Sequence, residues 1–166
     1  IVEALIVKLG LLIFYLFRPQ LASNIAAAIS KFVGKKISVH KLAYQNISNA
    51  LPNLSETEKQ KILDEMWDNL GRVVGEYPHV SYSNADEIMK NITMPTKTAE
   101  NLAMLKSLPR KGGIIFSGHI GNWEIGPKIF IKQGFDVHTV YRPLNNPYVE
   151  KMTSSIRGVP LIEKTA

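Results

Sequence analysis

The stretch that most constrains the fold covers residues 112–132, GGIIFSGHIGNWEIGPKIFIK. Its apolar run over 113–116 predicts a buried strand, two glycines break the pattern, and an apolar helix follows. Within one continuous helix, residues five apart lie about 140° apart around the axis, so His119 and Glu124 would not meet. With His119 in a turn and Glu124 at the start of the helix, the imidazole can fold back over the helix N-terminus. The stretch therefore predicts a strand-turn-helix corner that carries a base and a carboxylate.

The chain after residue 110 alternates between strand and helix patterns. Predicted strands cover 113–116, 137–141 and 159–162, and predicted helices cover 123–132, with Asn122 as N-cap, and 147–157. This alternation indicates an α/β fold with a mostly parallel sheet and right-handed crossovers. Ligands on such sheets bind at the carboxyl ends of the strands. His119 and Arg142 each follow a predicted strand, so we expect them at the same edge.

Residues 19–110 predict a helical region. Helices are expected over 21–32, 39–51 and 56–75, with short helices over 86–91 and 99–107. Ser55 and Glu58 have the spacing of a capping box that opens the third of these helices. Its apolar stripe is expected to contain Ile62, Met66, Leu70 and Val73, flanked by Leu63, Trp67 and Val74, with Trp67 in the core.

Residues 1–18 are the most hydrophobic part of the chain. A helix over 1–17 would be about 25 Å long, near the lower limit for crossing a bilayer. We expect a membrane-anchoring or half-inserted helix, and a buried core helix is the alternative. A signal peptide is disfavoured because no small-residue cleavage site follows. The chain starts at Ile1 without Met and ends just after a predicted strand, so we expect the N-terminal part of a longer protein, with the catalytic α/β core over 111–166 incomplete.

Charge and composition exclude several classes of function. The net charge of +6 suits an anionic partner, but no basic run with interleaved aromatics is present, which disfavours nucleic acid. The absence of Cys excludes disulfides, thiolate catalysis and Cys-ligated zinc. The sequence has no HExxH, nucleophile elbow, phosphate-binding loop or GxGxxG motif, and we predict no metal. What remains is a His–Glu pair without a protein nucleophile, which suits direct attack by a hydroxyl of the substrate.

Several segments carry a family resemblance. The motif at 119–124 has the form HxGNWE, and Tyr141-Arg142-Pro143 with Asn145-Asn146-Pro147 and Arg157-Gly158 form a second block. Residues 46–52, 66–72 and 76–78 add weaker similarity. Together these resemble the bacterial lipid A biosynthesis (late) acyltransferases of the lauroyl/myristoyl type, which belong to the lysophospholipid acyltransferase superfamily. The similarity extends over nearly the whole chain.

The resemblance implies a glycerolipid-acyltransferase-like fold and an enzyme at the cytoplasmic face of the bacterial inner membrane. It implies transfer of a fatty acyl chain from the phosphopantetheine of acyl-carrier protein to a hydroxyl of a lipid A precursor, without a separate cofactor. His119 would be the general base and Glu124 would orient it. Arg142, Asn122, Asn145 and Arg157 are the implied substrate-binding residues. Anionic membrane lipids are further expected partners.

Three other functions stay open on the residues alone. A related membrane lipid or lysophospholipid O-acyltransferase would use the same motif. A hydrolase could use the same pair to activate water. A non-catalytic membrane-associated remnant would need only the apolar N-terminus and the basic charge.

Overall fold

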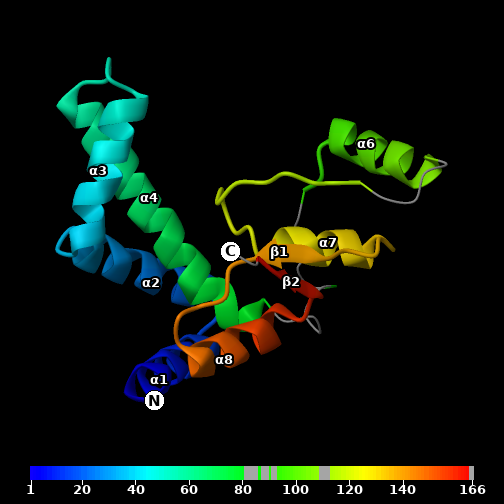
Figure 1. Cartoon of the computed structure of the whole chain (residues 1–166), viewed down its shortest axis with the longest axis horizontal. Helices are drawn as coiled ribbons and strands as arrows, with labels where there is room; N and C mark the ends of the chain where they lie inside the picture. Colours follow the sequence, from blue (N-terminus) through cyan, green and yellow to red (C-terminus); the bar gives the residue numbers. More distant parts are fainter. Residues whose placement is uncertain (81–85, 87–89, 91–92, 109–112, 165–166) are drawn as a thin grey trace.

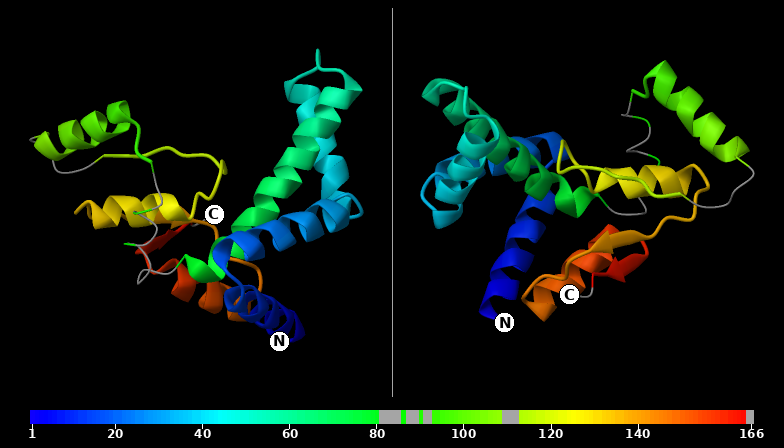
Figure 2. Two further views of the ribbon diagram at one scale, coloured as in Figure 1. Left: turned by 180° about the vertical axis from the view of Figure 1, so that it is seen from behind. Right: turned by 45° about the horizontal axis from the view of Figure 1, so that its top comes forward.

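The computed structural model describes residues 1–80, 86, 90, 93–108 and 113–164 (Figure 1). The elements in chain order are α1 (Val2–Leu16), α2 (Pro19–Gly34), α3 (Ser38–Ala50), α4 (Glu56–Glu76), the short 3-10 helix η1 (Tyr77–His79), α6 (Thr96–Ser107), α7 (Ile125–Lys132), β1 (Thr139–Tyr141), α8 (Pro147–Arg157) and β2 (Leu161–Glu163). The α2–α4 unit lies to one side, and α6 and α7 lie on the other (Figures 1 and 2). The helix predicted over 86–91 lies largely outside the described residues.

Local sequence signals set the ends of two helices. The capping box that opens α4 is confirmed, because the Ser55 side chain accepts from the Glu58 backbone and the Glu58 side chain accepts from the Ser55 backbone. In α8, Pro147 occupies the first turn and the Asn146 side chain caps it. Gly158 ends α8 with a φ of +58°, the left-handed conformation that favours glycine.

The main helix contact, between α2 and α4, is built from small residues. A Cβ added to Gly71 would lie 2.5 Å from the backbone oxygen of Ala26, and one added to Gly75 would lie 2.5 Å from that of Ala22. Trp67 is buried, as predicted, and its Nε1 donates to His40 Nδ1 on α3 at 3.0 Å. The two helix backbones can approach closely because glycine and alanine occupy the contact face.

The predicted apolar stripe of α4 is largely wrong. Of its four members only Val73 is buried, and Leu70 is 38% exposed. Leu63 and Trp67, expected beside the stripe, lie in the core. The contact face follows the small residues rather than the largest apolar ones, because helix contacts need close approach as well as hydrophobicity.

Replacing Gly71 with alanine is expected to destabilise the protein by about 1–3 kcal/mol, because the new methyl group overlaps the α2 backbone. The matched control is Gly10→Ala in α1, where a Cβ meets nothing within 4 Å. That change should leave stability equal or raise it by up to about 1 kcal/mol through helix propensity. Urea unfolding of both variants measures the difference, and a loss of the same size in both would contradict the close-packing account.

The sheet is smaller than predicted. Within the described residues, β1 and β2 pair in parallel with Val140 opposite Ile162, and α8 is the crossover between them. The predicted strands over 137–141 and 159–162 are confirmed in place, although both are shorter. The predicted buried strand over 113–116 is wrong: Ile114 and Phe116 lie outside any helix or strand and are 83% and 90% exposed. A strand needs a hydrogen-bonded neighbour, and an apolar run alone does not supply one.

Helix α1 has no buried residue. Its exposed apolar side chains include Leu5, Ile6, Leu9, Leu12 and Leu16. It is held near both ends. The His79 ring stacks on Tyr15 and its Nε2 lies 3.1 Å from the backbone oxygen of Phe14, while Asn146 Nδ2 donates to Glu3 Oε2 at 3.0 Å. The expectation of a buried core helix is therefore wrong. Among the described residues, no helix is both long enough and apolar enough to cross a membrane.

Candidate active site

The predicted catalytic corner is an exposed turn that leads into α7. The His119 residue is exposed, and its ring packs edge-on against the Trp123 ring, with centroids 4.6 Å apart. Gly121 has a φ of +57°, which a residue with a side chain adopts only with strain. Helix α7 starts at Ile125 with Glu124 as its N-cap. The prediction that Asn122 is the N-cap is therefore wrong, because its side chain binds Glu76 of α4 instead.

Side chains of α4 hold this turn. Asn122 Nδ2 donates to Glu76 Oε2 at 2.8 Å, and Asn69 Nδ2 donates to the backbone oxygen of Gly121 at 3.4 Å. The other Glu76 oxygen accepts from Ser23 Oγ of α2 at 2.7 Å. The turn that carries His119 is therefore attached to the packed α2–α4 unit.

Glu124 forms a buried ion pair with Arg157. The Arg157 Nε and NH2 groups each donate to one carboxylate oxygen at 2.8 Å, and Glu124 is only 9% exposed. Hydrogen bonding to Glu124 raises the pKa of Arg157, although burial opposes the shift. The guanidinium also lies 5.8 Å from the centre of the Tyr141 ring, so one cation bridges α7, β1 and α8. No hydrogen bond joins His119 to Glu124, and the expected contact between them is not formed here.

Two polar residues beside Glu124, the buried Lys128 and the half-buried Tyr77, were missed from the sequence. Lys128, one turn further along α7, is 2% exposed, and its Nζ lies 3.4 Å from the backbone oxygen of Ile156. Burial lowers the pKa of Lys128, and the Glu124 carboxylate offsets part of that shift. Tyr77 donates to the backbone oxygen of Thr153 at 2.9 Å, and burial, with Glu124 adding to it, raises its pKa to about 12. A lone lysine within an apolar helix was the signal available for Lys128.

Arg142 and Asn145 lie in the exposed loop after β1, as the sequence predicts for Arg142. Neither side chain makes a hydrogen bond or an ion pair with a described residue, so the structure leaves both available to a ligand. Convergence of Arg142 with His119 is not shown by any contact. Within the described parts of the chain, no cluster of three or more His, Asp or Glu side chains could hold a metal ion.

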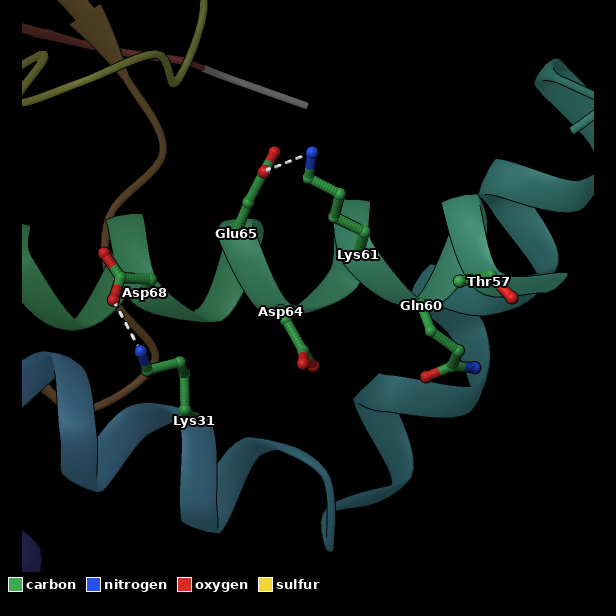
Figure 3. A pocket seen from close by; sticks show the side chains of 7 residues that line it. All are labelled: Lys31, Thr57, Gln60, Lys61, Asp64, Glu65 and Asp68. Carbon is green, nitrogen blue, oxygen red and sulfur yellow. Dashed lines mark ion pairs between the residues drawn. The ribbon is translucent and has the colours of Figure 1, made fainter. Parts of the chain in front are cut away.

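A shallow hollow between α2 and α4 is a poor candidate for the site (Figure 3). Its walls are charged. Lys31 of α2 forms an ion pair with Asp68 of α4 at 2.9 Å, and Lys61 pairs with Glu65 along α4 at 3.9 Å. No residue of the predicted catalytic corner lines it. The third carboxylate of its wall, Asp64, pairs with Lys35 at 2.7 Å, so each lining charge already has a partner.

An exposed imidazole five residues before a buried carboxylate is an arrangement compatible with general-base catalysis. Comparison of the sequence with known families gives a family of enzymes that is consistent with such catalysis. The model of the bacterial lipid A biosynthesis acyltransferases matches residues 2–159, so the chain belongs to this family. It is therefore an acyltransferase of lipid A biosynthesis. Searches of curated proteins and of solved structures find no significant match.

Proposed function

We propose that this acyltransferase moves a fatty acyl chain from acyl-carrier protein to a hydroxyl of a lipid A precursor, with His119 as the general base. The observation that carries the proposal is an exposed His119 within a family match that includes the whole HxGNWE motif. An exposed imidazole can reach a hydroxyl brought by the substrate. The absence of Cys from the sequence also favours direct transfer over a thioester on the enzyme.

In the proposed reaction, His119 takes the proton of the acceptor hydroxyl while the hydroxyl oxygen attacks the thioester carbonyl of the donor. The tetrahedral intermediate collapses to the new ester and expels the phosphopantetheine thiolate, which receives the proton from the imidazolium. Glu124 stabilises the imidazolium. A carboxylate that accepts two bonds from Arg157 still has free lone pairs, so it can also accept from the His119 ring.

Charge on the loop after β1 supports an anionic substrate. Arg142 is exposed and pairs with no described residue, so its guanidinium is free to bind a phosphate of the acceptor. Asn145 lies three residues further along the same exposed loop. Asn122 and Arg157, in contrast, use their donors on Glu76 and Glu124, and we assign both to holding the corner.

Acyl-carrier protein with a labelled acyl chain, incubated with the enzyme in the presence and absence of a lipid A precursor, tests the reaction. We expect acyl transfer that needs the acceptor, with little free fatty acid released in its absence. Release of fatty acid at the same rate without acceptor would identify a hydrolase instead. No turnover of acyl-carrier protein under either condition would favour the non-catalytic alternative, and transfer only to a lysophospholipid would favour the related O-acyltransferase.

We further propose that α1 binds the cytoplasmic face of the inner membrane. Most of its large apolar side chains are exposed, whereas Val7, Leu11 and Phe14 are half-buried, and exposed patches of this kind mark membrane or protein contacts. Lys8 and Arg18 are also exposed, and their positive charge favours anionic headgroups. A helix lying in the interface needs no membrane-spanning length.

Replacing Leu9 and Leu12 together with glutamate is expected to weaken binding to anionic liposomes at least about tenfold. The physical reason is that burial of one leucine side chain contributes about 1.5–3 kcal/mol, more than one factor of ten in affinity. Met104→Glu in α6 is the matched control, because Met104 is also exposed. Liposome flotation measures both variants, and equal binding by the two would contradict a role for α1.

A further inference from the structure

The Glu76 carboxylate, at the end of α4, joins three elements that are distant in sequence. One oxygen accepts from Ser23 Oγ on α2 at 2.7 Å, and the other accepts from Asn122 Nδ2 in the catalytic turn at 2.8 Å. Ser23 is 2% exposed, and Glu76 is half-buried. Since both carboxylate oxygens are engaged, Glu76 connects the packed α2–α4 unit to the turn that carries His119.

This contact fixes the orientation of the Asn122 amide. An ionised carboxylate only accepts hydrogen bonds, so Asn122 must present its NH2 group to Glu76. Its Oδ1 then points the other way, where it is buried and has no hydrogen-bond partner among the described residues. A buried acceptor without a donor is costly, so the bond to Glu76 must outweigh that cost in selecting this orientation.

The position of His119 depends on the same contact. Asn122 lies three residues after His119, and Gly121 between them adopts the left-handed conformation. Asn69 of α4 binds the Gly121 backbone oxygen and supplies a second attachment. Because the His119 ring has no hydrogen bond to a described residue, its place is set by the backbone of the turn and by Trp123.

We propose that Glu76 is a positioning residue for the general base, which it holds in place through Asn122. The proposal rests on the proposed function, because it assigns Glu76 a part in the reaction of His119. Ser23 in turn orients the Glu76 carboxylate from the buried side. Gly75, which packs on the Ala22 backbone, allows α2 to come close enough for this hydrogen bond.

Steady-state acyl transfer by wild-type protein, Glu76→Ala and His119→Ala tests the assignment. Glu76→Ala is expected to lower kcat about 10–100-fold, the scale of a small misplacement of a catalytic group. KM for both substrates should change less than about threefold, and the pH at half-maximal rate should not move. A large rise in KM, a shifted pH profile or unchanged kcat would overturn the positioning role.

Exchanging the donor and the acceptor between residues 76 and 122 makes the test independent of whether Glu76→Ala folds well. Asn122→Asp places two carboxylates against each other and should lower kcat at least as far as Glu76→Ala. Adding Glu76→Gln to Asn122→Asp restores a donor, since the glutamine amide can donate to the aspartate while its oxygen still accepts from Ser23. We expect kcat to recover at least about tenfold.

Absence of recovery would show that Asn122 contacts substrate directly, and it would overturn the proposal. The His119→Ala arm separates this outcome from failure of the proposed function. If His119→Ala transfers acyl groups at the wild-type rate, the general-base assignment fails whatever the Glu76 variants show.

Discussion

His119→Ala is expected to lower the rate of acyl transfer by about two to four orders of magnitude, the usual contribution of a general base. The fold should be unaffected, because His119 is exposed and its ring makes no hydrogen bond or ion pair with a described residue. A loss of activity without a loss of stability would therefore indicate that His119 acts in the chemical step. Acyl transfer from labelled acyl-carrier protein measures the rate, and urea unfolding measures stability.

His138→Ala is the matched control. His138 is also an exposed histidine, with 51% of its side chain accessible, and its Nε2 lies 3.3 Å from Asp136 Oδ1 ahead of β1. Its replacement should change the rate less than about twofold. Near-wild-type transfer by His119→Ala would remove the general-base mechanism, and equal losses in both variants would point to a non-specific effect of losing a histidine.

Helices with local signals were predicted well from the sequence. The Ser55 and Glu58 pair opens α4 as expected, and Pro147 and Gly158 bound α8 at the predicted residues. These signals involve backbone groups within one turn, so the sequence holds all the partners. The parallel pairing of β1 and β2 around α8 also follows from the strand-helix-strand order.

The helix contact face and the first strand could not be predicted from the same patterns. Gly71 and Gly75 lie four residues apart on one face of α4, and that spacing was the available signal for close packing. The run over 113–116 has the composition of a strand, but pairing depends on a neighbour elsewhere in the chain.

The partners of the site residues were the hardest part to predict. Glu124 was matched to His119 because the two are close in sequence, yet the structure pairs it with Arg157, 33 residues away. Glu76 and Asn122 are 46 residues apart. Such contacts depend on how α4, α7 and α8 pack, and neither residue type nor spacing within one segment encodes that.

Arg157→Ala is expected to destabilise the protein by about 3–5 kcal/mol, because it leaves the buried Glu124 carboxylate without its bidentate partner. The buried Lys128 ammonium, one turn away, cannot reproduce the two parallel bonds of a guanidinium. Lys61→Ala breaks the exposed Lys61–Glu65 pair, with N and O 3.9 Å apart, and should cost less than about 1 kcal/mol. Urea unfolding at neutral pH compares the two variants.

The double replacement Arg157→Met with Glu124→Gln identifies the cause of the loss. It removes the guanidinium and the carboxylate charge together, so no carboxylate is left buried without its partner, and it should be more stable than Arg157→Ala alone. It should still be inactive, since Glu124 is proposed to stabilise the imidazolium of His119. A double variant less stable than Arg157→Ala would mean that the unpaired Glu124 carboxylate is not the cause of the loss, and it would contradict the ion-pair account.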